Sequence, residues 1–185
     1  SGDLDGLSSL CAGDGDNAVC YGPNANATGK FTTALGAGAT AANSEISNVV
    51  DLGATAVGYL ANASGKNSVA IGRSSNTNGY QSIALGYKAI AKANHATAIG
   101  DRSQAGFRAI AIGQEAVAGR CSQALGWKAN ASGDYSQALG WQANANAFGA
   151  QASGYQAKAN GTGAQASGLY ATANGNYSMA LGSDA

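Results

Sequence analysis

The sequence predicts an all-β protein, a parallel β-solenoid of about twelve coils with 13–14 residues in each coil. Three observations predict this fold. A phrase of the form alanine, apolar residue, glycine recurs at near-constant spacing along the chain. Residues at alternate positions before and after that glycine are small. The repeat is too short for a pair of helices and has no helical apolar period, so each coil must consist of short strands and tight turns.

The repeat aligns on the glycine of this phrase, which we call the anchor glycine. From residue 58 onward, successive anchors are 13 or 14 residues apart, whereas the step from 36 to 58 is 22 residues. The longer step predicts an insertion that loops out within about 42–51. Residues 1–18 are predicted to form an N-terminal cap and residues 19–185 the repeats. The anchors, after a degenerate first copy at Gly22, are Gly36, Gly58, Gly72, Gly86, Gly100, Gly113, Gly126, Gly140, Gly154, Gly168 and Gly182.

Each coil is expected to contain two strands of about five residues and two tight turns. The residue two positions before the anchor is alanine in every full copy, and positions three and five after the anchor are mostly alanine. Alternate strand residues share a face, so these small side chains are expected to fill a thin interior. The anchor glycines and a second set are expected to supply the positive φ that the turns need; that second set is Gly65, Gly79, Gly133, Gly161 and Gly175.

The opposite face of the first strand carries the largest aliphatic side chains of the repeat. If they point away from the thin interior, they form an exposed apolar stripe, which a parallel homo-oligomer with cyclic symmetry would bury. The alternative is the reverse arrangement, with these side chains inside the coil, in which case no partner is needed. The predicted interface residues are Val69, Ile71, Ile83, Leu85, Ile99, Ile110, Ile112, Leu125, Leu139 and Leu181.

Aromatic residues recur one position after the anchor, at Tyr59, Tyr87, Trp127, Trp141 and Tyr155. The last three occupy consecutive coils and are predicted to stack as a ladder. Such a ladder either stiffens the solenoid or anchors a protein or sugar ligand. One position further on, Lys88, Arg102 and Lys128 form either a basic seam or an ordinary solvated face.

Composition excludes several classes of function. The chain has 10 basic and 10 acidic side chains, so its net charge gives no electrostatic case for nucleic acid or an anionic membrane. No apolar run approaches the about 20 residues that span a bilayer. His95 is the one histidine, so no catalytic histidine arrangement, metal site or cofactor is expected.

The chain has three cysteines. Cys11 and Cys20 are close in sequence and form either a disulfide or two buried thiols, with the disulfide favoured for an exported protein. Cys121 is expected to be a free thiol at a turn. The last repeat stops abruptly at residue 185, which favours a fragment of a longer chain.

The phrase Asn67-Ser68-Val69-Ala70-Ile71-Gly72 resembles the NSVAIG repeat of trimeric autotransporter adhesins, specifically the YadA-like head. Variants of the phrase extend the resemblance over about residues 19 to 185. The resemblance implies a left-handed parallel β-roll, assembled as a homotrimer on the surface of a Gram-negative bacterium as part of a larger autotransporter. It also implies a non-enzymatic function, attachment to collagen, fibronectin or laminin, to host cells or to other surfaces. Copies between residues 120 and 170 depart from NSVAIG, which puts any ligand of that phrase in doubt there.

The candidate ligand contacts are the phrase at 67–72 together with Trp127, Lys128, Trp141 and Tyr155. Other functions of a solenoid remain open. A structural spacer rod is compatible with the repeat. An ice-binding solenoid would favour regular threonine columns, whereas threonine is scattered in this chain. A hexapeptide acyltransferase is disfavoured, because its coils have about 18 residues and this chain lacks a second histidine.

Overall fold

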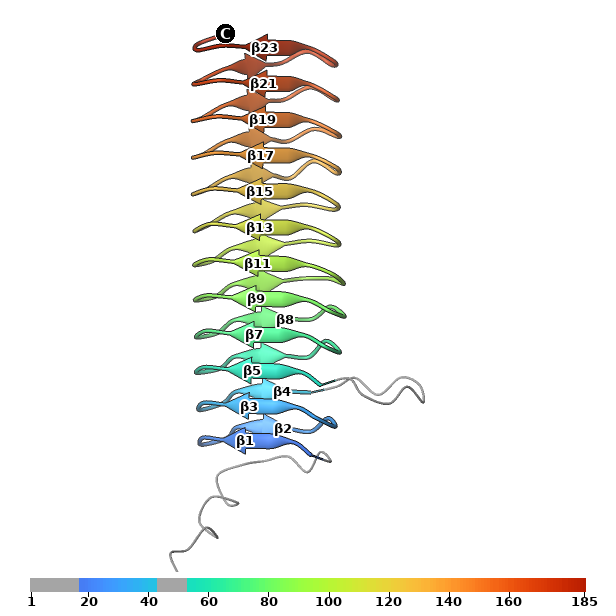
Figure 1. Ribbon diagram of the computed structural model, residues 1–185, viewed down its shortest axis with the longest axis vertical. Helices are drawn as coiled ribbons and strands as arrows, with labels where there is room; N and C mark the ends of the chain where they lie inside the picture. Colours follow the sequence, from blue (N-terminus) through green and yellow to red (C-terminus); the bar gives the residue numbers. More distant parts are fainter. Residues whose placement is uncertain (1–16, 43–52) are drawn as a thin grey trace, which may run out of the picture. The chain divides into compact units, whose positions relative to one another are not determined.

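The computed structural model describes residues 17–42 and 53–185, and the regular elements within these ranges are all β-strands. The chain divides into two compact units, residues 1–95 (unit 1) and 96–185 (unit 2). Within each unit, successive coils are laid one on another, and each coil supplies an odd-numbered strand to one sheet and an even-numbered strand to the other (Figure 1). The predicted parallel β-solenoid is therefore confirmed. Within the described ranges, no helix is long and apolar enough to cross a bilayer.

Unit 1 contains ten described strands. They pair in parallel with successive strands of the same sheet, and Val69, Ala70 and Ile71 face Ile83, Ala84 and Leu85 in register. The odd-numbered strands are β1 (Val19–Tyr21), β3 (Thr33–Leu35), β5 (Thr55–Val57), β7 (Val69–Ile71) and β9 (Ile83–Leu85). The even-numbered strands are β2 (Asn26–Ala27), β4 (Thr40–Ala41), β6 (Asn62–Ala63), β8 (Asn76–Thr77) and β10 (Ile90–Ala91).

Unit 2 repeats this arrangement. Its odd-numbered strands are β11 (Thr97–Ile99), β13 (Ile110–Ile112), β15 (Gln123–Leu125), β17 (Gln137–Leu139), β19 (Gln151–Ser153), β21 (Gln165–Ser167) and β23 (Met179–Leu181). Its even-numbered strands are β12 (Gln104–Ala105), β14 (Val117–Ala118), β16 (Asn130–Ala131), β18 (Asn144–Ala145), β20 (Lys158–Ala159) and β22 (Thr172–Ala173). The pairing keeps repeat positions aligned across coils of different length, as when Ala98 of β11 faces Ala111 of β13, 13 residues later.

The strands are shorter than the sequence analysis expects. Odd-numbered strands have three residues and even-numbered strands two, where about five were expected. The difference arises because each coil spends most of its residues in two turns, and both turns contain a residue with positive φ. The predicted insertion at 42–51 and most of the predicted cap at 1–18 lie outside the described residues.

The interior of each coil is made of alanine. Alanines of both sheets, such as Ala98, Ala111, Ala131 and Ala145, have exposed fractions of 0%. Serine and threonine replace alanine at some interior positions, and they remain hydrogen-bonded: the Ser82 hydroxyl donates to the carbonyl of Gly79 at 2.7 Å. Because only small side chains fit, the two sheets of a coil lie close together, as predicted. The reverse arrangement, with the large aliphatics inside, is excluded.

The two sets of glycines serve different purposes. The anchor glycines have φ between 119° and 139°, which confirms the prediction that they supply positive φ. The prediction was wrong for the second set, because Gly175 does not have positive φ, and neither do Gly65, Gly79, Gly133 and Gly161. A Cβ at any of these four positions would lie well under 3.0 Å from backbone atoms of the next coil. The next coil therefore leaves little room for a side chain at these four glycines, whereas alanine occupies the same repeat position at Ala93 and Ala147.

The outer faces of the two sheets differ in chemistry. Even-numbered strands present polar side chains that bond to equivalent residues of the next coil, as when the Asn62 side-chain amide donates to the Asn76 side-chain oxygen at 3.4 Å. The Asn160 amide likewise donates to Asn174 at 2.8 Å. Odd-numbered strands present mainly aliphatic side chains in unit 1, and aliphatic side chains together with glutamine and serine in unit 2. The face of the even-numbered strands is thus mostly polar, whereas the face of the odd-numbered strands is largely apolar in unit 1 and mixed in unit 2.

Candidate functional site

The candidate site lies at the turn after each anchor glycine. We call the first and second residues after the anchors the first-turn edge. Backbone hydrogen bonds fix these residues in register from coil to coil: the Lys128 amide donates to the Gln114 carbonyl, and the Gln142 amide donates to the Trp127 carbonyl, both at 2.8 Å. Side chains at equivalent positions are therefore held one coil apart, close enough to touch.

Aromatic rings form a continuous ladder on the first-turn edge of unit 2. The Trp127 and Trp141 rings stack with their centroids 4.8 Å apart and their planes 16° apart, and the Trp141 and Tyr155 rings stack at 4.5 Å and 3°. The Tyr170 ring meets the Tyr155 ring edge-on at 5.4 Å. The predicted ladder is confirmed. Centroid separations of this size are typical of offset stacking, so part of each ring stays uncovered; Trp141 is 36% exposed and Tyr155 is 40% exposed.

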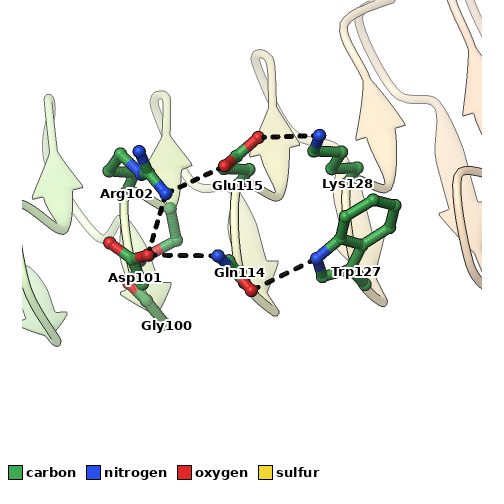
Figure 2. Close-up of polar contacts among 8 residues, drawn as sticks. Gly100, Asp101, Arg102, Gln114, Glu115, Trp127 and Lys128 are labelled. Carbon is green, nitrogen blue, oxygen red and sulfur yellow. Dashed lines mark hydrogen bonds and ion pairs between the residues drawn. The ribbon is translucent and has the colours of Figure 1, made fainter.

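A chain of hydrogen bonds leads to this ladder from its N-terminal side (Figure 2). The Gln114 side-chain amide donates to a carboxylate oxygen of Asp101 at 3.2 Å. The Gln114 carbonyl oxygen in turn accepts a hydrogen bond from the Trp127 indole nitrogen at 3.2 Å. Because the indole N–H is held at one end, the Trp127 ring has a fixed orientation from which the ladder is built.

Charged side chains run parallel to this chain in the neighbouring position (Figure 2). One carboxylate oxygen of Glu115 forms an ion pair with the Arg102 guanidinium at 3.0 Å, and the other forms an ion pair with the Lys128 ammonium at 3.4 Å. The Lys128 ammonium also lies 4.4 Å from the Trp127 ring centroid, which is a cation–π contact. Since Glu115 joins both cations, Arg102 and Lys128 are not an open basic seam. All three charged side chains are one-third or more exposed, so their pairing is screened by solvent.

The environment of Tyr155 changes its acidity. Partial burial raises the pKa of the Tyr155 phenol above its usual value, and the neighbouring Tyr170 raises it further by charge repulsion and by a hydrogen bond. The neutral phenol is thus favoured.

The first-turn edge of unit 1 carries a different ladder, in which an arginine lies between two tyrosines. The Arg73 guanidinium carbon is 5.7 Å from the Tyr59 ring centroid and 5.6 Å from that of Tyr87. The Lys88 ammonium lies 5.1 Å from the same Tyr87 ring. Sequence analysis identified the two tyrosines and Lys88 but missed Arg73. The signal was available, because residue 73 directly follows the anchor Gly72.

The predicted interface residues lie on the outer face of the odd-numbered strands. In unit 1 Ile71 is 41% exposed, and in unit 2 Ile112 is 40% exposed, whereas the alanines between them in the repeat are buried. The others are exposed or half-buried. In unit 2 this face includes Gln123, Gln137, Gln151 and Gln165, which occupy equivalent positions in consecutive coils. Each unit therefore leaves a band of large side chains uncovered by its own chain.

Three of the six residues in the phrase at 67–72 are enclosed in the coil or form the turn at its anchor glycine. Ser68 is buried, and its hydroxyl oxygen accepts a hydrogen bond from the Thr77 hydroxyl at 3.0 Å, while Ala70 is fully buried. Gly72 is an anchor with a φ of 125°. Asn67, in a turn with a φ of 53°, and the side chains of Val69 and Ile71 reach the surface. Only these three side chains of the phrase have surface available to a ligand.

The remaining candidates lie apart from the ladders. His95 occupies a turn with a φ of 58°, and its ring meets the Tyr80 ring edge-on at 5.6 Å. Cys20 is disulfide-bonded and Cys121 is a free thiol. Cys11 lies outside the described residues, so its pairing with Cys20 stays a prediction. Among the described residues, no group of three histidine, cysteine or acidic side chains is placed to hold a metal ion.

Comparison with protein families matches the YadA head domain repeat (2 copies) at residues 14–39, 52–75, 78–103, 124–143, 152–176 and 159–185. These segments cover well over half of the chain and fall on the coils described above. Comparison with curated proteins finds no match. The sequence period, the stacked coils and the family match agree, and the chain belongs to the YadA head domain family, whose repeats are characteristic of trimeric autotransporter adhesins.

Proposed function

We propose that this adhesin head attaches a Gram-negative bacterium to host extracellular matrix, to host cells or to other surfaces, as the exposed part of a larger autotransporter. The family is one of non-enzymatic adhesins, and its membership implies a surface-exposed location. Collagen, fibronectin and laminin are the proposed matrix ligands. The observation that carries the proposal is the exposed ladder of aromatic rings at the first-turn edge of unit 2, in a chain that belongs to a family of adhesin heads.

The proposed assembly is a homotrimer of left-handed β-rolls. Heads of this family are trimeric adhesins. The exposed aliphatic band on the odd-numbered strands supports a trimer for this chain, because an uncovered apolar surface of that kind is unfavourable in water. In the proposed trimer the predicted interface residues face the sister chains. The glutamine column of unit 2 then makes hydrogen bonds between chains, which satisfies its polar groups.

The proposed ligand contacts are Trp127, Trp141 and Tyr155, with Lys128 beside them. Large rings with little conformational entropy to lose are favourable contact residues in protein interfaces. The ladder also holds its rings in place before a ligand arrives, which lowers the entropy cost of binding. In the phrase at 67–72, Asn67, Val69 and Ile71 remain as proposed contacts, whereas Ser68 and Ala70 are enclosed and are not carried forward.

A solid-phase binding panel tests the proposal. The purified oligomer is applied to immobilised collagen, fibronectin, laminin and cultured cells, and the double variant Trp127→Ala/Trp141→Ala is compared with wild type. Phe148→Ala is the matched control, because Phe148 is also an exposed aromatic of unit 2 but does not belong to the ladder. We expect at least a tenfold loss of binding for the double variant and little change for the control.

Thermal unfolding and sedimentation confirm that each variant remains folded and assembled. Unchanged binding by a folded double variant would refute the ladder as the ligand site. Absence of binding by the wild type to every surface in the panel would refute attachment and favour the spacer role.

A further inference from the structure

By sequence, unit 1 has five basic and six acidic side chains and unit 2 has five basic and four acidic, so neither unit has a large net charge. In unit 1 the described residues include no aspartate or glutamate and carry five cationic side chains: Lys30, Lys66, Arg73, Lys88 and Lys92. The acidic residues of this unit belong to 1–16 and 43–52, outside the described residues. In unit 2, by contrast, acidic side chains pair with Arg102, Arg120 and Lys128. Within the described residues of unit 1, no aspartate or glutamate is therefore available to pair with these cations.

Two of these cations are held in place at the first-turn edge. Arg73 lies between the rings of Tyr59 and Tyr87, and Lys88 lies over the Tyr87 ring. Neither cation forms an ion pair with a residue of the described ranges. Lys30 and Lys66 take part in interactions of their own and do not belong to this edge. The rings fix the direction of the guanidinium group, so its N–H donors are ordered and remain available for an oxyanion.

The adjoining sheet face adds hydroxyl-binding groups to these cations. Lys88 precedes and Lys92 follows strand β10 (Ile90–Ala91) in the chain. Asn76, the outward residue of the preceding strand β8, is in register with Ile90 and accepts a hydrogen bond from the Asn62 side-chain amide. Cations close to the side-chain amides of Asn62 and Asn76 suit a chain that alternates anionic groups with hydroxyls. A polysaccharide bearing sulfate esters has this chemistry.

We propose that the edge formed by Tyr59, Arg73, Tyr87 and Lys88, continued by Lys92, binds a sulfated polysaccharide. Nucleic acid is the less suitable polyanion, because single strands are held largely by stacking of bases on free aromatic faces. In this edge the faces of the tyrosines are already in contact with Arg73 and Lys88. The proposal rests on the proposed cell-surface location, where such polysaccharides are accessible. The residues of this site are different from those of the ladder in unit 2.

The test compares two double variants that each remove two positive charges, one variant in each unit. Arg73→Gln/Lys88→Gln removes the unpaired cations of unit 1. Glutamine occurs naturally at equivalent positions, at Gln114 and Gln142, so both substitutions suit the turn. Arg102→Gln/Arg120→Gln is the control, because it removes two cations that are already paired, with Glu115 and with Asp134. Melting curves of all variants exclude loss of folding as the cause of a change.

Binding of the oligomer is measured on a surface carrying a heparin-type sulfated polysaccharide, on the same polysaccharide after desulfation, and on single-stranded DNA. We expect binding to the sulfated surface that weakens as salt rises, falls at least tenfold in the unit 1 variant and changes less than twofold in the control. Equal loss in both variants, equal binding to the desulfated surface, or tighter binding to DNA would each overturn the proposal. The matrix panel is run in parallel, so attachment to matrix proteins without polysaccharide binding would refute this inference alone.

Discussion

Replacing a glycine of the second set, such as Gly161, tests whether glycine is favoured at that position by the close stacking of the coils and not by the conformation of the turn. A Cβ at Gly161 would lie well under 3.0 Å from the backbone of Gly175 in the next coil, a contact that cannot be relieved by a side-chain rotation. At Gly175, the same addition meets only the Ser178 side chain, at 3.5 Å or more. Neither glycine has positive φ, so alanine is conformationally acceptable at both. The two substitutions thus differ mainly in the clash.

The magnitude follows from these contacts. Forcing an extra carbon atom against the backbone of the next coil costs about 1–3 kcal/mol. Weakening one neighbouring backbone hydrogen bond between coils, such as that from the Asn160 amide to the Ala173 carbonyl, adds about 0.5–1.5 kcal/mol. Gly161→Ala should therefore destabilise the protein by about 2–4 kcal/mol. Gly175→Ala should be neutral or stabilising by up to about 1 kcal/mol, because alanine restricts the unfolded chain.

Thermal unfolding followed by far-ultraviolet circular dichroism measures the difference. For a chain of this size each kcal/mol corresponds to about 2–4 °C in Tm, so we expect Gly161→Ala to melt about 5–15 °C below Gly175→Ala. Hydrogen exchange at the Asn160 amide should also accelerate in Gly161→Ala only. Equal melting temperatures for the two variants would refute the reasoning from close stacking.

Three further predictions concern side chains of unit 2. Glu115→Gln leaves two neighbouring cations without their shared carboxylate; because the pairs are partly exposed, we expect a loss of less than about 1 kcal/mol that disappears at high salt, measured by melting at two salt concentrations. The raised pKa of Tyr155 means that the folded state favours the neutral phenol, so its contribution to stability is lost as pH rises past the usual tyrosine range; Tyr170→Phe should lower that pKa in an ultraviolet titration, and an unchanged titration would contradict the assigned cause. Thiol titration of the native protein should detect only Cys121, and none should remain in Cys121→Ser; a second reactive thiol would contradict the predicted disulfide.

The fold was predictable because the period of the repeat can be measured directly from the sequence. Ala98 and Ala111 occupy the same repeat position, and the sheet pairs them as the alignment requires. Alternation then assigns the small side chains to the interior. Strand length was not predictable in the same way, since a repeat position does not reveal where backbone pairing gives way to a turn. The role of Gly65 was misjudged because sequence alone does not show how close the next coil lies.

The site was predictable only in part, for a related physical reason. Trp127 and Trp141 stack because the register fixes both their spacing and their direction. Contacts between unlike residues, such as Arg73 against Tyr59, depend on the conformations of long flexible side chains. The role of Glu115 was missed for the same reason, since Arg102 and Lys128 were considered without the acid in the coil between them.

The central claim of this account is that small side chains fill each coil and the large aliphatic side chains of the odd-numbered strands face sister chains. Sedimentation equilibrium of the purified protein across the micromolar range tests this claim most directly. The account predicts the mass of three chains, with no monomer at the lowest concentration. A stable and soluble monomer throughout that range would contradict it.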